Sequence, residues 1–346
     1  MKNKIILLFT IALLYFSVSC TNDNKGIVYY ENFPNEINLT GEIINIDDTI
    51  MHNYPLLTII EDKLVILDYA TDDNDYYYHV YDTINFSYKY SFCRKGRGPL
   101  EAMYCSSLTN KGNSLYVDNG LKRNQLREYR IGNDSAEITG NIELPNTDSF
   151  VTFNFTVKED NSVWALTSFG GNSRAYHINP MGAFIDSAYT IPENSTWSYS
   201  QHKNQWNSEL GYCLSKDKLI LATNFGERLD ILNTINKEHI VIIGPGGDPL
   251  TKEAIDPQLE IQGFIKLQIT DNYIYALYSG QKSRDVIWKQ IEEKFSINVY
   301  TLDGVPVIKF NLDKPIMSIY IDEENRTMYA TAVTGEEEES IVKYRF

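Results

Sequence analysis

Positive charge is scarce in this sequence. Its 346 residues include 31 Lys and Arg against 46 Asp and Glu, so the net charge is −15. Lys2 and Lys4 fall in an N-terminal leader, and without them the balance is 29 minus 46, or −17. Because phosphate groups are bound by clustered cations, this charge disfavours nucleic acids and anionic membrane surfaces as general partners. It fits a folded body in an extracytoplasmic space.

Motifs that carry catalysis or hold cofactors are also lacking. None of the five histidines is spaced as a metal-ligand pair such as H-x-x-x-H. The sequence has no G-x-S-x-G nucleophile elbow, no phosphate-binding Gly-Lys-Ser/Thr loop and no Rossmann glycine pattern. We therefore predict no catalytic residue, no cofactor and no metal site from motifs.

Long apolar runs are absent except for one at the N-terminus. Residues 5–16 are almost wholly apolar, follow two lysines and precede three small residues, Ser17, Val18 and Ser19. This is the layout of a signal peptide, and the run is short for a membrane span. The Ser19–Cys20 step resembles the cleavage site of bacterial lipoproteins, although Ser17 stands where leucine is commonest. We predict a lipoprotein signal peptide over residues 1–20, a lipid on Cys20 and a flexible tether over residues 21–36. An ordinary secretory leader is the alternative.

Cysteine is scarce as well: besides Cys20, the chain contains Cys93, Cys105 and Cys213. The predicted compartment permits disulfides, and a bridge between Cys93 and Cys105 would clamp the stretch between them. Three buried free thiols are the alternative. Because the count is odd, at least one of the three stays free unless it pairs with another chain.

The chain does contain a repeated unit. A short strand, a tight turn rich in Asp, Asn or Gly, and a second, very apolar strand recur six times between residues 58 and 330. Aligned on one position of the second strand, the copies are 51, 48, 56, 55 and 54 residues apart. The aligned positions are Ile66, Val117, Ala165, Leu221, Ala276 and Ala330. A third strand follows each copy, and a fourth follows the third in the first five.

Six four-stranded units of about fifty residues predict an all-β protein, a six-bladed β-propeller over residues 37–346 with four antiparallel strands per blade. The sixth unit ends at Phe346 without a fourth strand, and the run at residues 37–44 can supply it. Closing the last blade with an N-terminal strand removes an open sheet edge. A pair of β-sandwiches is the alternative, and prolines at matching blade exits argue against it.

One short segment carries a resemblance to a known family. Residues 95–101, KGRGPLE, are similar to a G-x-G-P-x-E-like turn that TolB-like six-bladed β-propeller lipoproteins of Gram-negative envelopes place after an early blade. With Ser19–Cys20 and the six units, the resemblance covers nearly the whole mature chain. Leu100 stands where a small or polar residue would also fit. The resemblance implies the propeller fold and an envelope location, and it supplies no catalytic residue, because the family has no established activity.

The same segment is the first candidate site. Its candidate anion-binding residues are Arg94, Lys95, Gly96, Arg97 and Gly98. The two glycines can adopt positive φ, and alternating backbone conformations form N–H concavities that bind anions, to which the three cations would add charge. The alternative, which we prefer, is a crossover between blades in which Arg97 pairs with a local acid such as Glu101. Residues 243–249 repeat the glycine–proline pattern without cations, and this recurrence favours a structural role.

The second candidate site is the long connection between the third and fourth units. Its candidate ligand- or partner-binding residues are Trp197, Tyr199, His202 and Trp206. Long loops on one face of a rigid scaffold are where binding is usually found, and aromatic planes beside amides suit sugars or peptides. The alternative is a loop that caps the central channel with its own aromatic rings.

Two hypotheses for function follow. The first is a lipid-anchored binding module of the cell envelope, on the periplasmic or surface side of the outer membrane, whose partner is a protein, peptide or glycan. The second is a propeller enzyme, such as a metal-dependent hydrolase or lyase, with carboxylates lining the channel. A divalent ion at the channel mouth would favour the second hypothesis, and an exposed aromatic patch on one rim would favour the first.

Overall fold

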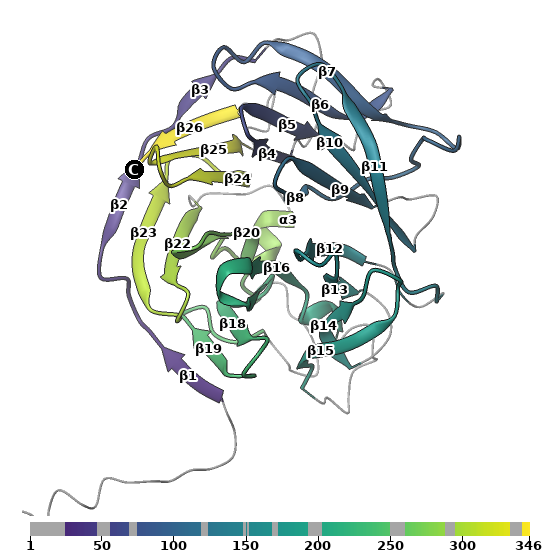
Figure 1. The fold of residues 1–346 in the computed structure, drawn as a ribbon. Coiled ribbons are helices and arrows are strands. Elements are labelled where there is room, and N and C mark those ends of the chain that lie inside the picture. Colours follow the sequence, from purple (N-terminus) through teal and green to yellow (C-terminus); the bar gives the residue numbers. More distant parts are fainter. Residues whose placement is uncertain are drawn as a thin grey trace, which may run out of the picture.

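Six β-sheets are arranged in a ring, as the blades of a propeller (Figure 1). The computed structural model describes residues 25–46, 56–68, 75–118, 124–147, 150, 152–167, 172–192, 203–249, 260–287, 295–332 and 341–346. Blades one, two, three and six contain four strands each, and blades four and five contain five. The predicted six-bladed β-propeller is therefore confirmed.

The strands that a blade takes from its own repeat follow one another in chain order, and from blade two round to blade one the first strands of successive blades contact each other. Blades one to three contain β4 (Leu56–Ile60), β5 (Lys63–Leu67), β6 (Tyr76–Asp82), β7 (Tyr88–Arg94), β8 (Thr109–Lys111), β9 (Ser114–Asp118), β10 (Gln125–Ile131), β11 (Ala136–Glu143), β12 (Thr152–Val157), β13 (Val163–Thr167), β14 (Ser173–Ile178) and β15 (Phe184–Thr190). Blades four to six contain β16 (Ser208–Cys213), β17 (Lys218–Thr223), β18 (Arg228–Asn233), β19 (His239–Ile243), β20 (Phe264–Ile269), β21 (Tyr273–Tyr278), β22 (Ser296–Thr301), β23 (Pro306–Leu312), β24 (Ile316–Asp322), β25 (Thr327–Ala332) and β26 (Ile341–Arg345). Two short helical turns, η1 (Leu214–Lys216) and α3 (Ser283–Ile287), lie in blades four and five.

An apolar cluster fills each space between neighbouring blades and so closes the ring. The second strand of each blade is almost entirely buried, because another blade packs against either face of it. Large side chains such as Trp164, Tyr300 and Tyr344 are buried in these clusters or between the blades. Removal of this apolar surface from water is the main force that holds the blades together.

Three N-terminal strands join sheets that are otherwise built from later parts of the chain. β3 (Glu42–Ile44) pairs antiparallel with β26 and completes blade six. The prediction gave the whole run at residues 37–44 to this blade; it is confirmed for the second half of the run and wrong for the first half, which joins blade five. β2 (Glu36–Leu39) runs parallel to β23 as the fifth strand of blade five. β1 (Lys25–Tyr29) runs parallel to β19 as the fifth strand of blade four. Figure 1 shows this purple segment along the outer edge of the ring.

The predicted tether at residues 21–36 needs a correction. Residues 25–29 form β1, and Glu36 begins β2. Ile27, Val28 and Tyr29 are residue types that favour strands, and β19 offers them an open sheet edge. The predicted leader, Cys20 and residues 21–24 lie outside the described residues.

The two faces of the ring differ in what joins the strands. Because alternate strands of a blade run in opposite directions, the turns after the first and third strands open on one face, here called the turn face. The connections after the second and fourth strands, which include the crossovers between blades, open on the opposite face, here called the connection face. Within the described ranges, no helix is long and apolar enough to cross a bilayer.

Candidate functional site

The predicted anion site is a loop at the exit of blade one whose backbone donor is engaged by the loop itself. Gly98 donates its N–H to Glu101 Oε2 at 2.7 Å. Gly96 has a φ of 151°, and a Cβ at this position would lie 2.0 Å from the same carboxylate oxygen. Only glycine fits this close approach. Glu101 thus occupies the place that the prediction gave to an external anion.

The three cations of this loop have different surroundings and do not converge on one site. Arg94 is 3.8 Å from Asp75, and both side chains are exposed. The Nζ atom of Lys95 lies 5.3 Å from the ring centre of Tyr77. Arg97 is exposed to solvent. The anion site therefore remains a prediction, and these contacts favour the structural alternative.

A buried cation that the sequence did not reveal fastens the same loop. Arg127, on β10 of blade two, donates to the carbonyl oxygens of Leu100 at 3.0 Å and Pro99 at 3.1 Å. Its guanidinium thereby joins the exit of blade one to the third strand of blade two. A single arginine within an alternating strand carries no sequence signal for this role, because the contact is made 27 residues away.

The two cysteines of the predicted disulfide lie side by side but are not bonded. Cys93 Sγ and Cys105 Sγ are 3.5 Å apart, whereas a disulfide needs about 2.05 Å. Both thiols are buried and free, as is that of Cys213. The hydrogen bond from Cys105 lowers the pKa of Cys93, and burial raises the pKa of Cys105. The structure thus supports the proximity of the pair and not the bond.

Of the four residues in the second candidate site, Trp206 is described, and three lie outside the described ranges: Trp197, Tyr199 and His202. Trp206 is only 5% exposed. The guanidinium carbons of Arg174 and Arg228 lie 5.4 Å and 5.2 Å from its ring, in cation–π geometry. The Trp206 ring is therefore buried against two arginines and is not a free binding surface.

These arginines belong to a charged network between blades three and four. The buried carboxylate of Asp230 accepts from Arg174 Nη1 at 2.6 Å and from Arg228 Nε at 2.9 Å. It also lies 2.9 Å from His239 Nε2. Burial alone would raise the pKa of Asp230, but Arg174, His239 and Arg228 together hold it well below its usual value. The network holds a charged carboxylate between the two blades, where Arg174 of blade three and Arg228 of blade four both bind it.

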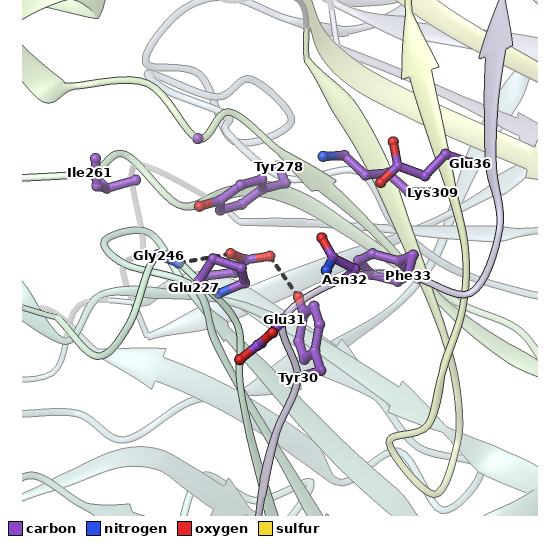
Figure 2. A pocket seen from close by; sticks show the side chains of 12 residues that line it. Tyr30, Glu31, Asn32, Phe33, Glu36, Glu227, Gly246, Ile261, Tyr278 and Lys309 are labelled. Carbon is purple, nitrogen blue, oxygen red and sulfur yellow. Dashed lines mark hydrogen bonds between the residues drawn. The ribbon is translucent and has the colours of Figure 1, made fainter.

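The most evident binding feature of the described residues is a cavity under the N-terminal segment. Residues 30–36, here called the strap, cross from β1 on blade four to β2 on blade five. A cavity of about 420 Å³, here called the strap cavity, lies between the strap and these two blades. Figure 2 shows Glu227 and Tyr278 on one side of it and Glu36 and Lys309 on the other.

Glu227 forms the floor of the strap cavity and ties the strap to both blades. Its buried carboxylate accepts from Tyr30 Oη at 2.6 Å and from Asn298 Nδ2 at 3.1 Å. A third donor is the N–H of Gly246, at 3.0 Å (Figure 2). Burial, reinforced by Tyr300 and Glu227, raises the pKa of Tyr30 far above its usual value. The Tyr30 hydroxyl therefore stays protonated and donates to the carboxylate.

The glycine–proline segment at residues 243–249 is explained by this floor. A Cβ at Gly244 would lie 2.4 Å from Glu227 Cδ, and a Cβ at Gly246 would lie 2.5 Å from Tyr278 Oη. Glycine is needed because the backbone passes directly over buried side chains. As in the loop of Glu101, a carboxylate receives the backbone donor, so the two glycine-rich segments share one structural device.

The rim of the strap cavity is acidic and aromatic. Glu31, Asn32 and Glu36 are exposed at its edge, and Lys309 is the cation among the residues that line it. The rings of Tyr30, Phe33 and Tyr278 supply apolar wall. Carboxylates and aromatic faces together suit a cation. Among the residues that the structure describes, no three or more His, Cys, Asp or Glu side chains are grouped so as to hold a metal ion.

Sequence reasoning missed the strap cavity because its walls come from several segments that lie far apart in the sequence. The strap, Glu227, the loop at residues 245–246 and the end of β21 meet only in the folded ring. The glycine–proline pattern at residues 243–249 is the sequence feature that marks one wall of the cavity, but its recurrence favours a structural interpretation.

The sheets and their closure by N-terminal strands define a six-bladed β-propeller, with a cavity under its N-terminal segment. The family model described as TolB-like 6-blade propeller-like matches residues 32–324, and the chain belongs to this family. The resemblance seen in the sequence is thereby confirmed.

Two of the solved structures that are similar to this chain come from Bacteroides species. One is from Bacteroides fragilis and is described as an exported protein; it is 13% identical, with a TM-score of 0.58, and the match covers 92% of this chain and 98% of that one. The other, a member of the DUF4221 family from Bacteroides vulgatus, is 11% identical, with a TM-score of 0.54, covering 90% and 98%. At these identities the likeness shows the fold alone. No curated protein matches this chain in sequence.

Proposed function

We propose that this protein is an envelope lipoprotein, anchored through Cys20, that binds a basic side chain of a peptide or protein partner in the strap cavity. The leader pattern and the small-residue–Cys step support the location. The similar Bacteroides fragilis structure, described as an exported protein, supports export as well.

The observation that carries the proposal is the lining of the strap cavity. Glu31 and Glu36 are exposed at its rim and Glu227 lies at its floor, whereas Lys309 is the one cation among the described residues that line it. Three carboxylates and one ammonium leave a negative cavity on a chain whose net charge is −15. An ammonium or guanidinium group would meet carboxylates at the rim and the rings of the wall, and desolvation there strengthens both attractions.

The size of the cavity also limits the ligand. A volume of about 420 Å³ falls in the range of roughly 300–1,000 Å³ that is usual for small-molecule sites. It accommodates one long side chain with its flanking backbone, but not a folded domain. A partner would therefore insert a lysine or arginine from an extended segment.

Calorimetric titration of the mature chain with two blocked tripeptides tests the proposal. Acetyl-Ala-Lys-Ala-amide should bind about tenfold more tightly than acetyl-Ala-Gln-Ala-amide, and added salt should weaken the difference. Glu31→Gln with Glu36→Gln should remove the preference without loss of stability. The matched control, Glu238→Gln with Glu324→Gln, changes two exposed acids on the turn face and should leave it intact. Equal affinity for both peptides, or tight binding of a neutral oligosaccharide insensitive to the rim variants, would refute the proposed ligand.

A further inference from the structure

The turn face carries exposed apolar residues at the tips of its outer turns. The turns after the third strands of blades one, three, four and five present Ile84, Met181, Ile235 and Val305. Single exposed apolar residues are ordinary on protein surfaces and by themselves define no interface. What distinguishes one of these tips is its place beside the N-terminus.

The first described strand begins next to the turn that carries Ile235. β1 runs parallel to β19, and Lys25 pairs with His239, the first residue after the turn at residues 234–238. The side chains of Ile27 and Tyr29 project from the same side of β1, because side chains alternate along a strand. Their exposed fractions are 54% and 72%, and that of Ile235 is 72%. In the described part of the chain, blade three contains four strands, and none of them pairs with β1.

The length of chain before β1 limits how far this edge lies from the anchor. Cys20 precedes Lys25 by five residues, which span at most roughly 18 Å when fully extended. A lipid on Cys20 therefore holds the start of β1 within that distance of the bilayer surface. Ile84 lies on blade one, which is three blades away and so on the opposite side of the ring.

We infer that the outer edge of blade four, at Ile27, Tyr29 and Ile235, contacts the bilayer into which the Cys20 lipid inserts. The inference rests on the lipid anchor of the proposed function. Isoleucine and tyrosine are suited to the boundary between lipid headgroups and hydrocarbon. The contact holds the ring by one edge instead of by a whole face.

Charge explains why the ring does not lie flat on its turn face. The turns after the first strands place acids there, including Glu61, Asp62, Glu323 and Glu324. Pressing these carboxylates against headgroups would remove them from water, or bring them near anionic lipids, at a cost in free energy. Contact at the edge avoids this.

Side-chain footprinting of the full lipid-modified chain in phosphatidylethanolamine–phosphatidylglycerol vesicles tests the inference. Hydroxyl-radical oxidation at Ile27, Tyr29 and Ile235 should be roughly threefold slower or more than in the Cys20→Ala chain in the same vesicle suspension, as expected for side chains buried in the interface. Ile84 and Met181, which are 87% and 84% exposed, are the internal controls and should be unchanged. Equal protection of Ile84 and Met181 would show a ring lying flat, and no protection at any position would show a freely hanging ring; either result overturns the inference.

The lipid anchor itself is read separately, from the intact mass of the purified chain. If Cys20 carries no lipid, the anchor of the proposed function fails, and the edge contact is then tested by coupling Cys20 to a maleimide lipid and repeating the footprint. Protection at the blade-four edge in that preparation supports the contact, and its absence overturns it.

Discussion

Replacement of Tyr30 by phenylalanine removes the hydroxyl through which the strap is hydrogen-bonded to the ring. The phenyl ring keeps the packing of Tyr30 against Phe33 and Tyr300, whose ring centres lie 5.2 Å and 5.9 Å away. Only the hydroxyl is lost, and with it two hydrogen bonds of 2.6 Å, one to the buried carboxylate of Glu227 and one to the hydroxyl of Tyr300. A hydrogen bond to a charged group stabilises by about 1.5–3 kcal/mol.

Hydrogen exchange is the assay, because the strap and β1 can open without the ring unfolding. A loss of 1.5–3 kcal/mol should speed exchange of the β1 amides by roughly 10- to 100-fold, while the amides of β5 in blade one stay protected. The neighbouring variant Tyr29→Phe is the matched control, since Tyr29 is largely exposed. Exchange in the Tyr30→Phe chain within twofold of the parent rate would refute the view that Glu227 holds the strap through this hydroxyl.

Two further predictions concern stability. Burial lowers the pKa of Lys203 to about 8. The unfolded chain keeps this proton to higher pH, so the folded state gains stability as the pH rises above 8. Measured by urea unfolding, the free energy of unfolding of the parent chain relative to Lys203→Met should rise by about 2 kcal/mol from pH 8 to pH 10. A constant difference between the two chains over that range would contradict the low pKa. Glu101→Ala should lower the free energy of unfolding by about 1–3 kcal/mol, since the N–H of Gly98 loses its acceptor, whereas Arg97→Ala should change it by less than about 0.5 kcal/mol. A larger loss of stability in Arg97→Ala than in Glu101→Ala would show that Arg97, and not Glu101, holds the loop.

The fold could be predicted because each blade is a local unit. A strand, turn and strand lie within about a dozen residues, so the repeat spacing and the apolar second strands are visible in the sequence. The closure by β3 followed from the missing fourth strand of blade six. The parallel strands β1 and β2 were not predicted in full, because their partners β19 and β23 lie more than 200 residues away.

The sites were less predictable, because they depend on contacts between distant segments. The glycines of the blade-one exit indicated a backbone concavity, but the sequence did not show that Glu101 fills it. Trp206 was read as a binding aromatic, whereas Arg174, on a strand of the preceding blade, covers one face of its ring. In both cases a polar side chain, Glu101 or Arg174, contacts the group that we predicted to bind a ligand. The spacing of residues in the sequence does not show which side chain makes that contact.

Photo-crosslinking in the native envelope tests the central claim most directly. A benzoylphenylalanine at Asn32, on the rim of the strap cavity, should form an adduct with a peptide or protein, at a site within a few residues of a lysine or arginine. The same probe at Asn325, an exposed asparagine in a turn of blade six, serves as the matched control and should not form that adduct. Adducts at Asn32 that are confined to saccharide, or that equal those at Asn325, would contradict a strap cavity that binds a basic side chain.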